Sequence, residues 1–157
     1  MVFDSKLQRK IMGGFATGVT VVTCRVGDEL HGMTANAVTS VSLDPPLVLV
    51  AVAKSAGFHA QLSAAGSFAM NILTAEQEEL SNRFAMKGAK PFDDIPLQTS
   101  ETGTPVFAEG LGFVECKVAE VLAGGDHDIF LGEIVAGEAR DGEPLLYFAG
   151  GYRRISG

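Results

Sequence analysis

The double proline at Asp44-Pro45-Pro46 constrains the fold of this chain more than any other feature. A run typical of a β-strand lies on each side of it, over residues 38–43 and 47–53. Proline cannot donate a backbone hydrogen bond to a strand ladder, so the three residues favour a turn between two strands. The second run, LVLVAVA, is apolar at both alternating positions, which is typical of a strand covered on both faces. These features predict a closed or doubly covered sheet.

The rest of the chain predicts further strands joined by tight turns, with helices inserted early. The expected helices cover roughly residues 5–15 with a capping box from Ser5, 55–65 with Ser55 as the cap and Gly66 as the stop, and a third from a capping box at Thr74. The expected strands cover 18–26, 67–73, 112–122, 128–139 and 145–155, with a long Gly-, Pro- and Asp-rich loop over 86–112. Asp141-Gly142 predicts a tight hairpin, and Gly150-Gly151 a bulge or a close ligand approach. This pattern favours a mainly β fold, a barrel with peripheral helices.

Bulk properties narrow the class of protein further. The 157 residues fit a single domain, 1–157, and 46% hydrophobic residues provide a real core. A net charge of −7 without a basic block makes nucleic acid an unexpected partner. The longest apolar run, 47–53, is far shorter than the ~20 residues of a membrane helix, and no secretory signal precedes it. Cys24 and Cys116 are isolated and are expected to be reduced core thiols, as in a cytoplasmic protein.

Small polar residues precede the first strand run, and a basic residue follows the second. Small side chains let a flat ring approach backbone N–H groups, and a lysine and a hydroxyl at a helix N-terminus suit a phosphate ester. We therefore expect a flavin nucleotide along a strand edge with its phosphate at the helix start; ordinary strand-edge serines and threonines are the alternative. The candidates are Thr34, Ala35, Asn36, Thr39, Ser40, Ser42, Lys54 and Ser55.

A histidine between two aspartates forms a second candidate. His127 lies in the glycine-rich turn 124–128, where aspartate neighbours raise imidazole basicity and glycines allow a ligand to approach. The alternative is a solvated loop residue. A metal site is not expected, because His31, His59 and His127 are isolated and lack paired-ligand spacing.

Two further segments carry aromatic and basic side chains. Tyr152-Arg153-Arg154 predicts either a tyrosine stacked on a ring with arginines near a phosphate, or a charged edge strand that resists aggregation. Phe92, Lys87 and Lys90 in the long loop could cover a bound cofactor, whereas Phe84 is expected to be core on its helix.

At these residues the chain resembles the short-chain flavin reductase family, small NAD(P)H:flavin oxidoreductases with an FMN-binding split-barrel fold. The resemblance runs nearly end to end. It rests on FATGVTVVT (15–23), GMTANAVTSVSLDPPLVLV (32–50), KSAGFHAQL (54–62), the GGDHDIFLGEIV segment and PLLYFAGGYRRI. It implies an FMN-binding split β-barrel, FMN or FAD as cofactor, and NADH or NADPH as cosubstrate.

The resemblance also implies a role for each matching residue. The flavin ring and ribityl chain would be lined by Thr34, Ala35, Asn36, Ser40, Val41 and Ser42. The phosphate end would be held by Ala53, Lys54, Ser55, Phe58 and His59. His127, with Tyr152, would lie on the nicotinamide side, where the histidine orients the ring rather than accepting a proton. Many family members carry Asn at the position of Ala53 and Arg or Ser at that of Gly57, so the choice between FMN and FAD stays open.

The expected function is hydride transfer from NAD(P)H to FMN or FAD, with reduced flavin supplied to a partner monooxygenase. The resemblance implies a homodimer with flavin sites near the interface. Two alternatives remain: an FMN-binding electron carrier or sensor without nicotinamide turnover, and a flavin-dependent reductase of another acceptor, ferric iron or a corrinoid.

Overall fold

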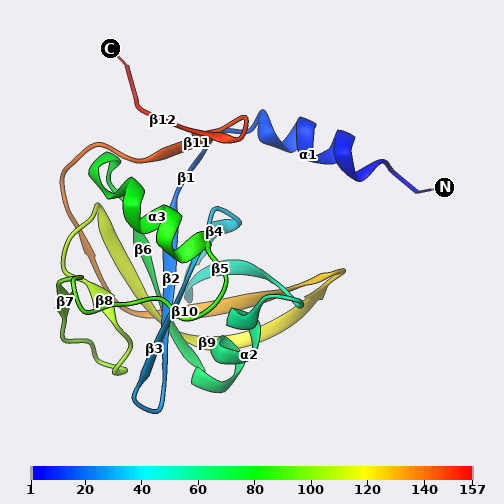
Figure 1. The fold of residues 1–157 in the computed structure, drawn as a ribbon. Helices are drawn as coiled ribbons and strands as arrows, with labels where there is room; N and C mark the ends of the chain where they lie inside the picture. The colour runs from blue at the N-terminus through cyan, green and yellow to red at the C-terminus, as the bar shows by residue number, and fades with distance from the viewer. Residues whose placement is uncertain (1, 157) are drawn as a thin grey trace.

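The computed structural model describes residues 2–156, and its largest feature is a seven-stranded antiparallel sheet (Figure 1). Across the sheet the strands follow the order β3-β2-β6-β9-β10-β5-β4. They are β2 (Thr20–Val26), β3 (Glu29–Ala35), β4 (Val38–Leu43), β5 (Pro46–Ala53), β6 (Ser67–Ile72), β9 (Gly112–Gly124) and β10 (His127–Ala139). β3 and β4 end this order on opposite sides, yet only two residues separate them in the chain. The sheet must therefore curl until its edges approach each other.

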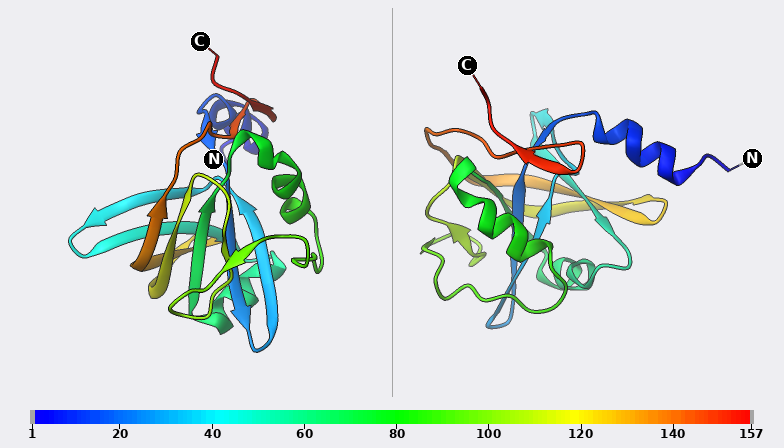
Figure 2. Two further views of the ribbon diagram at one scale, coloured as in Figure 1. Left: turned by 90° about the vertical axis from the view of Figure 1, so that its left-hand side faces the viewer. Right: turned by 45° about the horizontal axis from the view of Figure 1, so that its top comes forward.

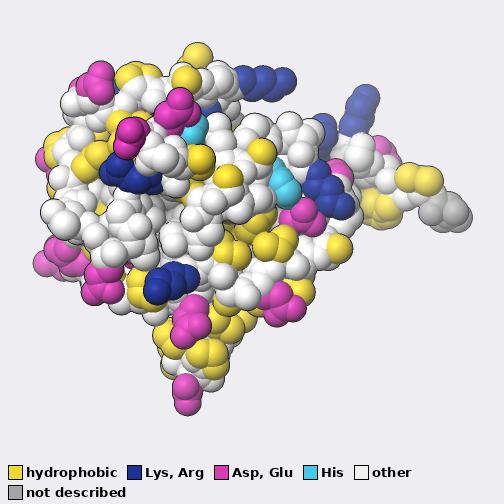
Figure 3. Space-filling view, turned by 90° about the horizontal axis from the view of Figure 1, so that it is seen from below, with side chains coloured by type: hydrophobic (Ala, Val, Ile, Leu, Met, Phe, Trp, Pro, Cys, Tyr) yellow, Lys and Arg dark blue, Asp and Glu magenta, His cyan; other side chains and the backbone are white. Residues whose placement is uncertain are grey.

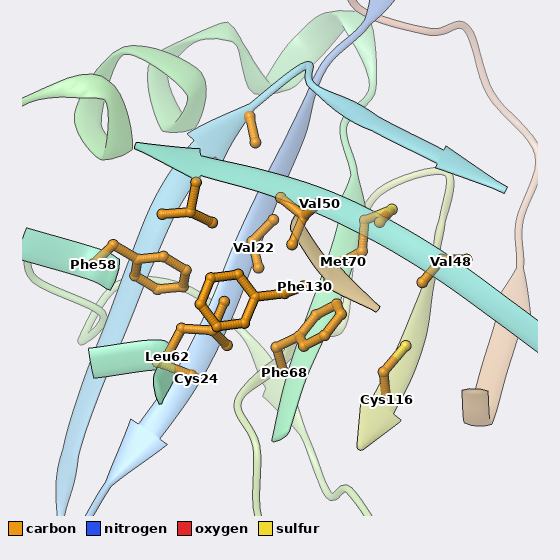
Figure 4. Packing of buried hydrophobic residues seen from close by; sticks show 12 residues of the cluster. Val22, Cys24, Val48, Val50, Phe58, Leu62, Phe68, Met70, Cys116 and Phe130 are labelled. Atoms are coloured by element: carbon orange, nitrogen blue, oxygen red, sulfur yellow. The ribbon is translucent and has the colours of Figure 1, made fainter. Parts of the chain in front are cut away.

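The curled sheet encloses a core to which distant strands contribute together. Val22 of β2 and Val50 of β5 belong to one cluster although three strands separate β2 from β5 in the sheet. Phe130 of β10 lies between Phe58 and Phe68 at the centre of this cluster (Figure 4). The mainly β, barrel-like fold predicted from the sequence is confirmed.

A second apolar cluster covers the outer face of β2. Val22 and Cys24 point into the enclosed core, whereas Val21 packs outward with Phe84, Phe107 and other residues of this second cluster. Residues 20–24 are consequently all buried, as predicted for a strand covered on both faces. β5 is covered less evenly, because its inward residues are buried and its outward residues only half-buried.

Helices and short strands surround the sheet. They are α1 (Ser5–Gly13), α2 (Gly57–Ala65), the 3₁₀ turn η1 (Ala75–Gln77), α3 (Glu78–Ala85), β1 (Thr17–Gly18), β7 (Leu97–Gln98), β8 (Val106–Phe107), β11 (Leu146–Phe148) and β12 (Gly151–Arg153). α3 lies across the sheet beside β3, and α1 projects away from the body (Figures 1 and 2). α1 contains no buried residue, so its apolar side has no partner within the described chain.

The helix ends depart from the predicted caps at two places. Asp4, not Ser5, caps α1, because its side chain accepts a hydrogen bond from the Lys6 N–H at 3.0 Å. Ala56, not Ser55, is the N-cap of α2, and no side chain caps that end. The predicted stop at Gly66 is confirmed by its left-handed φ of 71°. The predicted capping box from Thr74 forms, but it starts the 3₁₀ turn that precedes α3.

Two predictions near the C-terminus were wrong: the hairpin at Asp141-Gly142 and the bulge at Gly150-Gly151. Asp141-Gly142 forms no hairpin. After β10 the chain crosses to the N-terminal strand β1, and there it forms β11, which pairs with β1. Burial of Leu145 in the second cluster, with its N–H bonded to the Leu73 carbonyl at 3.2 Å, directs this crossing. Gly150 lies in the tight turn between β11 and β12 at a φ of 79°, so the glycine pair turns the chain and makes no bulge.

Charged side chains are dispersed over the lower face of the molecule. Basic and acidic side chains are both spread over this face, and the projecting β4–β5 hairpin carries hydrophobic and acidic groups (Figure 3). Within residues 2–156, no helix has the length and apolar character needed to cross a membrane.

Candidate functional site

A pocket of about 990 Å³ lies along the outer edge of β3. One wall is the start of α2, residues 55–58 and 61, and the other is the end of α3 with the loop that follows it, residues 81 and 84–90. Tyr147 and Tyr152 border the pocket from the C-terminal hairpin. The pocket is at the upper end of the ~300–1,000 Å³ range that is usual for ligand sites.

The floor of the pocket is the unpaired edge of β3. A two-residue turn at 27–28 joins β2 to β3 and makes Val26 and Glu29 a pair. In an antiparallel ladder, alternate residues bond to the partner strand, so Glu29, His31 and Met33 face β2. Gly32 and Thr34 therefore direct their backbone N–H and C=O groups away from β2, toward the pocket that both residues line. This edge offers hydrogen-bonding groups to a flat ligand.

α3 is fixed against β3 by two close contacts. The Thr34 hydroxyl donates to the Ser81 carbonyl at 2.6 Å. Gly32 lies under the Phe84 ring, where an added Cβ atom would be 2.8 Å from ring carbon Cδ1. A larger residue at position 32 would push α3 off the strand and change the pocket wall.

The C-terminal hairpin meets α3 at one end of the pocket. The Tyr152 hydroxyl lies 2.5 Å from Ser81 Oγ and 3.1 Å from Asn82 Oδ1. The Tyr147 and Tyr152 rings meet edge to face, with centroids 5.5 Å apart. Tyr152 was predicted from the sequence as a site residue, whereas Tyr147 and Ser81 were not. Tyr147 lies directly opposite Tyr152 across the β11–β12 pair, a relationship that only a correctly predicted turn at Gly150 would have revealed.

The start of α2 presents backbone donors to the pocket. Its N-cap Ala56 is extended and supplies no side-chain acceptor, and the first N–H groups of any α-helix lack partners within the helix. Gly57 and Phe58 are the first two helical residues and line the pocket. The Phe58 ring itself is buried in the core, so its backbone is the part available to a ligand.

The histidine turn lies next to α2 rather than in the pocket lining. His127 is paired with Ala53, and the Lys54 N–H donates to the Asp126 carbonyl at 2.9 Å. His127 Nδ1 lies 2.7 Å from Asp126 Oδ1, and this hydrogen bond lowers the Asp126 pKa. His59, in the first turn of α2, forms a second such pair with Asp128 in β10, at 2.7 Å.

The remaining predicted residues lie at three other places. Ala35 is buried in the enclosed core, and Phe92 in the second cluster, where its ring is 5.1 Å from that of Phe84. Ser40, Val41 and Ser42 lie on β4, in the projecting hairpin, where a register shift interrupts pairing with β5. Of the predicted site residues, Thr34, Asn36, Ser55, Phe58 and Tyr152 line the pocket together.

Arg83 of α3 binds the far end of the loop that follows this helix. Its guanidinium donates two hydrogen bonds to Asp94, at 2.7 and 2.8 Å, one to the Pro91 carbonyl at 3.0 Å and two to Glu79. The bond from Arg83 holds the pKa of the Asp94 carboxyl below its ordinary value. Lys87 and Lys90 of this loop line the pocket, and partial burial lowers the Lys90 pKa. Among residues 2–156, no cluster of His, Cys, Asp and Glu is arranged to hold a metal ion.

A roomy pocket, a free strand edge and an uncapped helix start are what a β-barrel protein needs to bind a nucleotide that carries a flat ring. The chain matches the flavin reductase like domain family over residues 12–156. It is 42% identical over 153 residues to the FMN reductase (NADH) SmoA of Agrobacterium fabrum, covering 98% of this chain and 87% of that protein. It therefore belongs to the flavin reductase like domain family, which confirms the resemblance predicted from the sequence.

Two further relatives extend the comparison. The chain is 40% identical over 142 residues to the reductase component of a 4-nitrophenol 4-monooxygenase/4-nitrocatechol 2-monooxygenase of Rhodococcus opacus, covering 90% of this chain and 76% of that one. The NADH:FAD oxidoreductase SgcE6 of Streptomyces globisporus, solved in complex with NAD and FAD fragments, superposes with a TM-score of 0.91. It is 40% identical, and the match covers 99% of this chain and 97% of that one.

Proposed function

We propose that the chain is an NAD(P)H-dependent flavin reductase whose flavin ring lies along the free edge of β3. The observation that carries this proposal is the row of outward-facing backbone groups at Gly32 and Thr34 on the floor of a pocket walled by α2 and α3. The named activities of the relatives, an NADH-dependent FMN reductase and an NADH:FAD oxidoreductase, support it.

The residues present fit a flavin nucleotide at both of its ends. The β3 edge at Gly32 and Thr34 offers backbone hydrogen-bonding groups to a flat ring, and Asn36 adds an amide just after β3. At the start of α2, the N–H groups of Gly57 and Phe58 and the Ser55 hydroxyl suit a phosphate group. The positive end of the helix dipole adds to this attraction.

A flavin held in this pocket would supply the redox chemistry, as the acceptor of hydride from the nicotinamide. The tasks of the protein are to hold the two rings face to face and to exclude water. Backbone N–H groups at the β3 edge would stabilise negative charge that develops on a reduced ring held there. Tyr152, fixed by Ser81 and Asn82, forms a rigid aromatic border for the nicotinamide.

His127 is proposed to orient the nicotinamide from the turn beside α2. Its Nδ1 atom is bonded to Asp126, so the ring is held in one orientation and its Nε2 atom stays available. We expect His127→Ala to slow NADH-dependent flavin reduction about tenfold or more while the flavin Kd changes little. Stopped-flow hydride transfer measures the first quantity and flavin fluorescence the second; an unchanged hydride-transfer rate would exclude this role.

We also propose a partner and an assembly for the chain. We infer that reduced flavin is passed to a monooxygenase, as the name of the Rhodococcus opacus relative suggests. A homodimer is supported by the unpartnered apolar side of α1 and by Val41 and Leu43 exposed on the β4–β5 hairpin. Free buried Cys24 and Cys116 agree with a reducing, cytoplasmic location.

One experiment tests the function directly. The protein is mixed with FMN or FAD and with NADH or NADPH in all four combinations, and absorbance is followed at the nicotinamide band. We expect rapid NAD(P)H oxidation that depends on added flavin. Flavin binding without nicotinamide oxidation would instead indicate an electron carrier or sensor, and no flavin binding at all would exclude both.

A further inference from the structure

The loop between α3 and Phe92 places two lysines at a defined end of the pocket. α3 runs along β3 from the Thr34–Ser81 contact to the Gly32–Phe84 contact, so the following loop continues toward Glu29. Thr34 and Glu29 are five residues apart in a strand, about 17 Å. Lys87 and Lys90 therefore lie at the Glu29 and His31 end of the pocket, opposite the Tyr152 end.

Within the described residues, these lysines are cations without an acidic partner. No ion pair involving Lys87 or Lys90 is found among residues 2–156, whereas Arg83 is fully engaged by Glu79 and Asp94. Glu29 is the acidic residue of the pocket lining, and its side chain is 81% exposed and turned to His31. Lys90 is half-buried, and its ammonium loses hydration there, which lowers its pKa. The chain has a net charge of −7, so two unpaired lysines make the charge of this pocket wall opposite to that of the molecule as a whole.

The loop that carries the lysines is anchored at its ends before any ligand arrives. Arg83 ties the ends of the loop together through Pro91 and Asp94. Beneath the loop, the Phe84 and Phe92 rings pack with centroids 5.1 Å apart. A preorganised site binds an anion with less loss of conformational entropy than a mobile loop would.

The pocket thus has two places for anions on facing walls. The start of α2 suits one phosphate, as proposed above, and the lysine loop provides a second position. A mononucleotide such as FMN carries one phosphate group and requires only the first. We propose that Lys87 and Lys90 form a subsite for the diphosphate of a dinucleotide, so that the pocket distinguishes dinucleotides from mononucleotides. This inference rests on the proposed function, and the diphosphate can belong to FAD or to the nicotinamide dinucleotide.

The test compares the wild type with Lys87→Gln/Lys90→Gln and with Lys117→Gln, which removes an exposed charge on β9 outside the pocket. Calorimetric Kd values are measured for FMN and FAD without a nicotinamide. In a second arm, riboflavin-saturated protein is titrated with NAD⁺ and with nicotinamide mononucleotide. Thermal unfolding verifies that each variant folds.

If FAD supplies the diphosphate, the double variant should weaken FAD binding about tenfold or more and FMN binding less than about threefold, because charge-assisted hydrogen bonds are strong. If the nicotinamide dinucleotide supplies it, NAD⁺ binding should weaken and mononucleotide binding should not. In either case, raising NaCl from about 50 to about 500 mM should weaken dinucleotide binding less in the variant than in the wild type. Lys117→Gln should reproduce none of these changes.

Two results would overturn the subsite. If the double variant binds FAD and NAD⁺ as tightly as the wild type does, the lysines have no role in binding a diphosphate. Equal weakening of FMN and FAD would assign them to the first phosphate instead. Failure of the proposed function is distinct from both, because wild-type protein would then oxidise no NAD(P)H with either flavin.

Discussion

Glu115 shows how one buried side chain orders a distant loop. Its side chain, 1% exposed on β9, accepts hydrogen bonds from the Glu101 N–H at 3.2 Å and from the Thr102 N–H at 2.7 Å, and a further one from the Thr102 hydroxyl. Burial acts to raise the Glu115 pKa, but the hydrogen bonds from Thr102 and Glu101 outweigh it and lower the pKa. The ionised carboxylate therefore belongs to the folded state.

We expect Glu115→Gln to lower the free energy of unfolding at neutral pH by about 2–3 kcal/mol, because an amide NH₂ would face N–H donors. A carboxyl whose pKa falls on folding stabilises the protein above its unfolded pKa, near 4.3, and loses that contribution as the pH falls through the folded pKa. The gap between wild type and variant should therefore narrow below about pH 4. Urea unfolding across pH measures it, with exposed Glu133→Gln as control; a gap that stays constant with pH would contradict ionisation of Glu115.

The two cysteines are expected to be chemically silent in the folded protein. Cys24 and Cys116 are fully buried, and burial raises the pKa of each thiol to about 12. At pH 8 the reactive thiolate is therefore scarce as well as inaccessible. A thiol reagent should label neither residue in the native state and both after unfolding in urea; rapid native labelling would show that the core opens easily.

At the scale of elements, glycines decide how closely strands and helices pack. Gly132 of β10 lies beside the Phe68 ring, where an added Cβ atom would be 2.5 Å from Cζ and 2.7 Å from the Cβ atom of Cys116. Both neighbours are fully buried and have little room to move. Gly32 likewise allows β3 and α3 to pack closely.

We expect Gly132→Ala to destabilise the protein by about 1–3 kcal/mol through overpacking. Gly18→Ala is the matched control, because no atom lies within 4 Å of the added methyl group. Chemical denaturation of both variants checks the prediction. Equal stability of the two would mean that the core around Phe68 repacks without cost.

At the scale of the whole molecule, the exposed apolar side of α1 has no explanation within a single copy of the chain. Leu7, Ile11 and Phe15 recur on one side of the N-terminal segment and are 45%, 56% and 70% exposed. Helices of soluble proteins normally bury such a side against another element. A second copy of the chain, as proposed above, would supply the missing surface.

We expect Ile11→Glu to convert the proposed dimer to a monomer at micromolar concentration, because a charge on the apolar side cannot be buried unpaired. Arg9→Glu places an acidic group on the opposite side of the helix and should leave the dimer intact. Analytical ultracentrifugation distinguishes the two states. A wild-type protein that sediments as a monomer would remove α1 from consideration as an interface.

The sequence by itself determined the identity of most elements, because the period of apolar residues and the turn residues act locally. The strand over 38–43, the turn at the double proline, the stop at Gly66 and the doubly covered strand around Val21 and Val22 all follow from such local patterns. The spacing of the motifs also predicted the family, since the matching segments extend along nearly the whole chain.

Only the tertiary structure decided which residues share the pocket. Thr34, Ser55 and Tyr152 are far apart in the chain, and the curl of the sheet, the contact of α3 with Gly32 and the crossing after β10 bring them to one edge. The same crossing overrode the local hairpin preference of Asp141-Gly142, because burial of Leu145 involves distant partners. Long-range burial outweighs a local turn preference when the two conflict, and no short stretch of sequence contains that information.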